Sequence, residues 1–208
     1  MPATSLSPRK RPLQARSKAT RDAIIEAAAQ IIAARGLAGF NTNAVAERAG
    51  TSIGSLYQYF PNKDALMVAL IHRSQQAQLQ SVAEAVGSAP PDADLATLIR
   101  VIVRGAMKHH RDDSLLASAI DHEEARLPIE GKLQDYLTEG GGMVRALLTR
   151  HLPQLSESEI SRAVYTLPAL VRAVVDRWAN LSPPQLSVAE DEAVRAVTGY
   201  LAEGSNVG

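Results

Sequence analysis

The stretch TSIGSLYQYFPNK, residues 51–63, holds an unusual share of the chain's aromatic side chains. The 208 residues include five tyrosines, two phenylalanines and one tryptophan, and Tyr57, Tyr59 and Phe60 fall within four positions here. Lys63 closes the stretch. Because tyrosine combines a rigid apolar ring with a polar tip, such a cluster favours a place where local packing and hydrogen bonding are both needed.

A helix over residues 52–60 would sort these side chains onto separate faces. At 100° per residue, Leu56 and Phe60 nearly overlap and form a stripe suited to burial. Gly54 and Gln58 point in almost the opposite direction. The outward side of this helix is therefore small and polar, which permits close approach to another molecule.

Two further helices are expected before this stretch. Apolar residues recur every three and four positions over residues 17–35, with a start between 17 and 20, and Gly36 supplies a left-handed stop. A short helix fits residues 42–49, with Thr42 as its N-cap and Gly50 at its end. Two short helices joined by a glycine-containing turn are typical of a helix-turn-helix, whose second helix enters the major groove of DNA.

The flanks of the helix over residues 52–60 suit a position between two phosphate walls. Tyr57 lies on one flank, and Ser55 and Tyr59 lie on the other. Their hydroxyl groups can reach phosphates while the rings pack locally. Lys63 adds a cation for the DNA backbone, and Thr42 offers a hydroxyl at a helix N-terminus. The alternative is that the two tyrosines only complete a small core.

Residues 20–66 resemble the DNA-binding domain of the TetR family of transcriptional regulators. The resemblance rests on TRDAIIEAAAQIIAARGLAGFNTNAVAERAGTSIGSLYQYFPNKDAL and on its order AxxAGxSxGSLYxYFxNKxxL. It implies a three-helix DNA-binding head, a linking helix that begins near Lys63, and a larger helical body for dimerisation and ligand sensing.

The resemblance also implies roles for single residues. Those that match the family's phosphate-contacting positions are Thr42, Tyr57, Tyr59 and Lys63. Those that match its base-facing positions are Asn43, Ile53, Gly54 and Ser55. The turn residues Thr51 and Ser52, together with Gln58, complete the predicted DNA-contacting set. Thr51 stands where the family usually has valine, and Ile53 and Gly54 offer no side-chain hydrogen bond. Base readout would then depend on Asn43, Ser55, Gln58, thymine methyl contacts and DNA shape.

Charge is distributed unevenly along the chain. Residues 1–63 carry nine basic and three acidic side chains, a net charge of +6, so the remainder of this formally neutral chain carries −6. A basic end on an acidic body indicates that one end meets a polyanion. In the proline-rich segment 1–15, Arg9, Lys10 and Arg11 form a basic arm that could enter a minor groove or contact phosphates. The alternative is a solubilising tail.

The remainder of the chain predicts helices and no strands. Helical patterning resumes at Lys63 and continues to about residue 86, and two prolines in the segment 87–94 end it. Amphipathic runs follow at 95–109, 113–125, 129–151, 157–181 and 188–203. We therefore expect an all-α fold of about nine helices, with an arm over 1–15, a helix-turn-helix DNA-binding domain over 16–62, and a ligand-binding and dimerisation domain over 63–208. The pattern leaves open whether residues 140–142, three glycines, lie in a helix or a loop.

The body carries no motif that the residues alone identify. By the resemblance, the last two long helices form the dimer interface, and an apolar stripe suits it: Leu167, Leu170, Val171, Val174, Val175 and Trp178. Burial within one subunit must account for part of that stripe. Five residues could line a mostly apolar effector cavity, although each also fits ordinary core: Met107, His110, Met143, Tyr165 and Trp178.

Other classes of protein fit the sequence poorly. There is no cysteine, no histidine pair at helical metal-ligand spacing and no nucleotide-binding glycine motif, so we expect no metal, no cofactor and no catalysis. The lack of a long apolar run favours a cytoplasmic protein. The best interpretation is a dimeric repressor released from a palindromic DNA operator by a small molecule. An activator of the same fold, or a helical ligand sensor that acts through protein contacts, remains the alternative.

Overall fold

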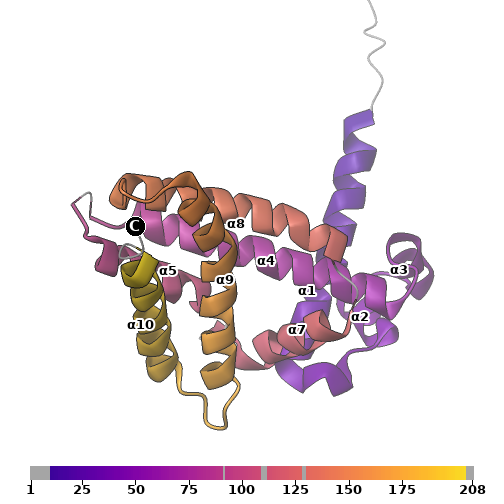
Figure 1. Ribbon diagram of the computed structural model, residues 1–208. Helices are drawn as coiled ribbons and strands as arrows, with labels where there is room; N and C mark the ends of the chain where they lie inside the picture. Colours follow the sequence, from indigo (N-terminus) through magenta and orange to yellow (C-terminus); the bar gives the residue numbers. More distant parts are fainter. Residues whose placement is uncertain (1–9, 91, 109–111, 128–129, 205–208) are drawn as a thin grey trace, which may run out of the picture. The chain divides into compact units, whose positions relative to one another are not determined.

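The computed structural model describes residues 10–90, 92–108, 112–127 and 130–204 (Figure 1). Within these ranges the chain forms nine helices and no strand, which confirms the all-α prediction. It divides into two compact units, Met1–Leu70 and Ile71–Gly208. The division falls inside α4 (Lys63–Gly87), which begins at the predicted residue. None of the helices in the described ranges is long and apolar enough to span a membrane.

The first helix, α1 (Lys10–Gly39), starts earlier than the sequence pattern predicts. The expected start between residues 17 and 20 is wrong, because Pro12 stands in the first turn, where a backbone N–H has no partner within the helix. The stop expected at Gly36 is confirmed, since this residue takes a φ of 61° and interrupts the helix before a last turn. Arg9 lies outside the described residues, and the backbone of Lys10 and Arg11 forms the first turn of α1.

Two short helices follow, α2 (Thr42–Arg48) and α3 (Ile53–Tyr59), each within one residue of its predicted bounds. Thr42 is not the N-cap of α2, as the sequence suggested. Asn41 takes that place, and its Oδ1 accepts a hydrogen bond from the backbone N–H of Ala44 at 2.9 Å. Asparagine is among the strongest N-cap residues, so the cap falls one residue earlier.

The core of the first unit joins its helices through apolar side chains. α2 packs on both α1 and α3. The largest fully buried side chains are Phe40, Ile24, Ile32, Leu56, Leu66, Met67, Leu70 and Val45. Burying side chains of this size stabilises a folded unit by roughly 1.5–3 kcal/mol each. This core fixes α3 by its inner face and leaves its outer face to solvent.

The second unit is built from the last part of α4 and five further helices. These are α5 (Leu95–Ala106), α7 (Ser114–Arg126), α8 (Glu130–His151), α9 (Glu157–Ala179) and α10 (Leu186–Gly204). Their bounds lie within about three residues of those predicted from the sequence. The longest pair, α9 and α10, lies side by side (Figure 1) and makes the most extensive contact between helices in this unit.

The core of the second unit lies between α5, α8, α9 and α10. Met107 is completely buried in it, and Leu167 and Val175 of α9 point into it. Ion pairs at the edge of this core join α5 to α10. The buried carboxylate of Glu190 accepts hydrogen bonds from Arg100 at 3.0 Å and from Arg104 at 2.8 Å.

The three glycines of α8 lie within a continuous helix, which decides a point that the sequence pattern left open. A Cβ atom on Gly140 would lie 3.2 Å from Leu79 of α4, and one on Gly141 would lie 3.0 Å from Val164 of α9. Both distances are tighter than ordinary van der Waals contact. Glycine at these two positions therefore permits α8 to approach two neighbouring helices closely.

Candidate nucleic-acid interface

The turn between α2 and α3 is held by the backbone and by a capping serine. Gly50 takes a φ of 64°, and the N–H of Thr51 donates to the carbonyl of Ala46 at 3.0 Å. The Oγ of Ser52 accepts from the N–H of Ser55 at 3.0 Å and lies 2.9 Å from the hydroxyl of the same residue. The two serines predicted to contact DNA thus also fix the start of α3.

The faces of α3 are arranged as its sequence predicts. Leu56 is completely buried, and Phe60, which caps the helix, is 3% exposed. Gly54 and Gln58 lie on the exposed side. Ile53, at the start of the helix, is 39% exposed, so an apolar side chain stands beside the small polar surface. Such a surface offers both polar and methyl contacts to a partner.

A pair of hydroxyl groups connects α2 to α3. The Oγ1 of Thr42 and the Oη of Tyr57 lie 3.3 Å apart, within hydrogen-bonding distance. Because Asn41 caps α2, the Thr42 hydroxyl is not needed for capping and can meet the tyrosine. Tyr57 is 48% exposed. The two residues that sequence reasoning assigned separately to phosphate contacts therefore form one polar point on the surface.

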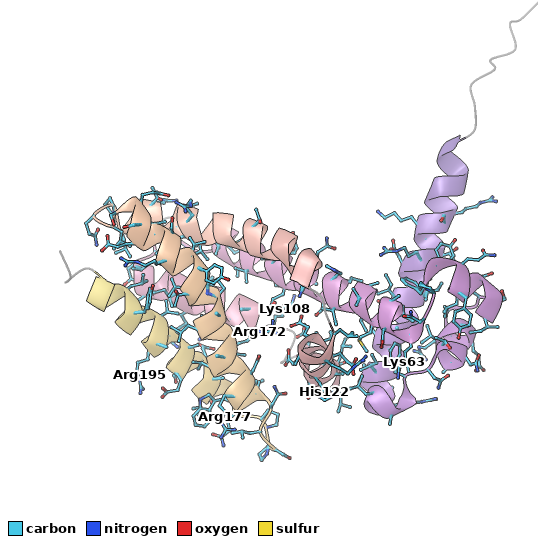
Figure 2. All side chains as sticks on the ribbon, turned by 45° about the vertical axis from the view of Figure 1, so that its right-hand side comes forward. Lys63, Lys108, His122, Arg172, Arg177 and Arg195 are labelled. Atoms are coloured by element: carbon cyan, nitrogen blue, oxygen red, sulfur yellow. The ribbon has the colours of Figure 1, made fainter. Side chains whose placement is uncertain are left out.

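Lys63 is held at the start of α4 by an aromatic ring. Its Nζ lies 4.9 Å from the centroid of the Phe40 ring, while the lysine itself is exposed (Figure 2). A cation over a ring at an exposed site gains about 0.5–1 kcal/mol, which restricts the lysine without neutralising its charge. Arg21 makes a similar contact, with its guanidinium carbon 5.8 Å from the centroid of the Phe60 ring.

Sequence reasoning missed the contacts that hold two basic residues of the first unit. Arg21 meets a ring far along the chain, and Arg48 donates from Nε to Gln30 Oε1 at 2.7 Å. Gln30 in turn donates to Glu26 at 2.8 Å. Only Glu26 and Gln30 are at helical spacing, so a local pattern could have indicated that pair but not the two long-range contacts.

The remaining predicted DNA contacts are placed as follows. Asn43 is exposed in the first turn of α2, and Tyr59 is half-buried on the flank of α3. The side chains of Lys10 and Arg11, like all of Arg9, fall outside what the structure describes. The exposed face of α3, the hydroxyl pair and Lys63 all belong to one compact unit, so the structure brings most of the predicted set together.

The residues predicted for an effector cavity are not brought together in the same way. Met107 is completely buried in the core, and Trp178 packs against that core from α9. Met143 is half-buried in α8. Tyr165, expected in a cavity lining, is instead 82% exposed on the outer face of α9, because its helix turns the neighbouring Ala163 and Leu167 inward. His110 lies outside the described residues.

Metal chemistry finds no support in the described part of the chain. Within it, no group of three histidine, aspartate or glutamate side chains is arranged to hold a metal ion. The polar groups that the structure brings together in the first unit are hydroxyls, amides and cations. They suit hydrogen bonding and charge neutralisation of an anionic partner.

A buried three-helix core, a glycine turn and an outward polar face on α3 define a helix-turn-helix DNA-binding protein. Residues 24–70 match the family of bacterial regulatory proteins called the tetR family, and residues 94–201 match the tetracyclin repressor-like C-terminal domain. The chain therefore belongs to the TetR family, and it is a DNA-binding transcriptional regulator. No curated protein matches it in sequence.

Solved structures of other regulators share the fold. The fatty acid degradation regulator FadR from Bacillus halodurans is 20% identical, with a TM-score of 0.65 over 86% of this chain and 97% of its own. FadR from Bacillus subtilis, in complex with stearoyl-CoA, is 18% identical, with a TM-score of 0.66 over 85% and 96%. The multidrug binding protein EbrR, complexed with malachite green, is 23% identical, with a TM-score of 0.58 over 86% and 96%.

Proposed function

We propose that this regulator is a dimeric repressor that leaves a palindromic operator when a small molecule binds its second unit. The observation that carries the proposal is the outward face of α3, where a small polar surface adjoins the hydroxyl pair of Thr42 and Tyr57. In this account α3 lies in a major groove of DNA. A dimer places two such helices about 34–36 Å apart, so that each reads one half-site.

The proposed contacts divide into those that position the protein and those that read sequence. Phosphates are bound by Thr42, Tyr57, Tyr59 and Lys63, and by the arm residues Arg9, Lys10 and Arg11. The bases are read by Asn43, Ser55 and Gln58, while Ile53 contacts thymine methyl groups and Gly54 permits the close approach. Thr51 and Ser52 lie at the edge of this surface, where the turn meets the DNA backbone. Phosphate contacts supply affinity, and base contacts supply specificity.

The second copy would dock on the outer faces of α9 and α10. Leu167 and Val175 of the predicted stripe are consumed by the core of their own unit. A shallow groove remains between the two helices, lined by Ala173, Val174, Arg177, Trp178, Glu192, Arg195 and Ala196. Figure 2 shows Arg177 and Arg195 on these two helices. Small and apolar residues at the floor, with charges of both signs at the rim, suit a symmetric interface between helices.

The effector proposal is supported by the second unit and by two structural neighbours. FadR from Bacillus subtilis binds stearoyl-CoA and EbrR binds malachite green, so this fold accommodates large, mainly apolar molecules. A ligand shifts the regulator only as far as its affinity differs between the DNA-bound and released states, and a few kcal/mol is sufficient.

The proposal is tested by fluorescence anisotropy of the purified protein on DNA that flanks its own gene, against scrambled DNA of equal length. We expect tighter binding to the flanking DNA at two salt concentrations, with affinity falling as salt rises, because bound phosphates release counterions. Equal binding to both DNAs would lead to a selection from random sequences. Failure of that selection to enrich any sequence would contradict the proposal.

A further inference from the structure

Gln75 is a buried polar residue in the inward stripe of α4. Its side chain is 6% exposed, whereas Ile71, one turn earlier on the same face, is an apolar residue that is 1% exposed. Leu79, one turn later, faces α8 at Gly140. A helix face that packs against its neighbours normally carries apolar residues, so a glutamine at this position needs an explanation.

The orientation of the Gln75 amide follows from its partner. Nε2 donates to Glu124 Oε1 of α7 at 2.9 Å. A carboxylate only accepts hydrogen bonds, so the amide nitrogen must face it and Oε1 must point elsewhere. Gln75 Oε1 is shielded from solvent and has no hydrogen-bond donor in the described structure. A buried acceptor without a donor destabilises a folded protein, which is why such atoms are rare.

The surroundings of Gln75 are rich in carboxylates. Arg172 of α9 donates to Glu124 and, from Nε, to Asp176 at 3.4 Å (Figure 2). Partial burial disfavours the charged guanidinium, but the charges and hydrogen bonds of Glu124, Asp176 and Asp121 outweigh burial and raise the pKa of Arg172 above its ordinary value. Three carboxylates thus surround one guanidinium, which leaves excess negative charge beside the unsatisfied oxygen.

These features define the chemistry that would complete the site. An anionic group would meet acceptors and negative charge, so it is disfavoured. A neutral donor could satisfy Gln75 Oε1 alone. A protonated amine could satisfy the same oxygen and also gain from the excess of carboxylates, because charge-assisted hydrogen bonds are the stronger ones. The apolar neighbours of Gln75 along α4 suit a hydrocarbon body attached to that amine.

We propose that Gln75 binds the polar head of the effector through Oε1, and that this head is a protonated amine on an apolar body. The inference rests on the proposed function only in taking the ligand to be the regulator's effector. The contacts reach α4, α7 and α9, so a ligand at Gln75 acts on helices that are distant in the sequence. One of them, α4, also carries Lys63 at its first position.

The test uses three probes with the same chain and different heads: octylammonium, octanol and octanoate. Each is titrated into the full-length protein by isothermal calorimetry at neutral pH, below its micelle-forming concentration. We expect octylammonium to bind at least about tenfold more tightly than octanol, and octanoate to bind most weakly. Gln75→Leu removes the acceptor at similar volume and should abolish the preference for the ammonium, while Gln76→Leu, the exposed neighbour on α4, should preserve it.

Circular dichroism of Gln75→Leu shows whether the variant folds, and Gln75→Met provides a second substitution of similar volume if it does not. Octanoate binding as tightly as octylammonium, an unchanged order in both variants, or no binding of any probe would overturn the proposal. Operator binding without a probe is measured on the same samples. Its loss would contradict the proposed function, whereas intact operator binding with the wrong order of probes would contradict only the amine site.

Discussion

At the scale of single residues, the Thr42 and Tyr57 hydroxyls, 3.3 Å apart, join two helices at one point. Tyr57→Phe keeps the ring and removes the hydroxyl, so the exposed position should lose little stability. One hydrogen bond contributes about 0.5–1.5 kcal/mol, and operator affinity should therefore fall about threefold to tenfold. The salt dependence should not change, because no charge is lost. Anisotropy measures both, and Tyr200→Phe, in the second unit, should leave both unaltered.

Lys63 should behave differently from Tyr57, because it brings a charge to the interface. Lys63→Gln removes one proposed phosphate contact, and the slope of log affinity against log salt should become shallower by about 0.9. Lys108→Gln removes an exposed lysine of the second unit and is the matched control (Figure 2). An equal change of slope in both variants would mean that Lys63 acts only through the overall charge of the protein.

Most of the candidate site could be predicted at this scale, and its contacts could not. Spacing alone placed Leu56 inward and Gln58 outward, because a helix of regular geometry fixes those directions. The position of Lys63 over Phe40 depends on how α1 and α4 pack, which no local pattern records. The exposure of Tyr165 was missed for a related reason, since apolar and aromatic residues on α9 serve two different faces.

At the scale of elements, the glycines of α8 give the sharpest stability prediction. A Cβ on Gly142 would meet nothing within 4 Å, so Gly142→Ala should stabilise the protein by about 1 kcal/mol through helix propensity. At Gly141 the new Cβ would lie 3.0 Å from Val164, whose branched side chain adapts poorly. Gly141→Ala should therefore gain much less stability or lose some, as measured by urea unfolding. Equal gains in both variants would contradict the close approach of α8 and α9.

The helices themselves were largely predictable, and their exact ends were less so. Glycine and proline marked most boundaries, including the interruption at Gly36. The N-cap of α2 was misassigned because Asn41 and Thr42 are adjacent residues that both cap well, and only the hydrogen bond to Ala44 separates them. The start of α1 was misassigned because a proline was taken as a barrier, although the first turn of a helix tolerates it.

At the scale of the whole molecule, the account requires a dimer. Ala173 is an exposed residue of the groove between α9 and α10, and Ala173→Glu would place a charge where a second copy is proposed to pack. We expect this variant to sediment as a monomer at micromolar concentration and to lose most of its operator affinity, because one helix-turn-helix reads only half a site. Ala83→Glu, at an exposed position of α4, should remain dimeric. A dimeric Ala173→Glu protein would place the interface elsewhere.

The central claim is that a pair of α3 helices reads DNA through the outward face that carries Gln58. The most direct test selects preferred sites from a random DNA library with the natural protein and with Gln58→Ala. We predict a palindromic site for the natural protein, and a loss of preference at matching positions in both half-sites for the variant. Recovery of the same palindrome with unchanged preferences, or of no preferred sequence at all, would contradict the account.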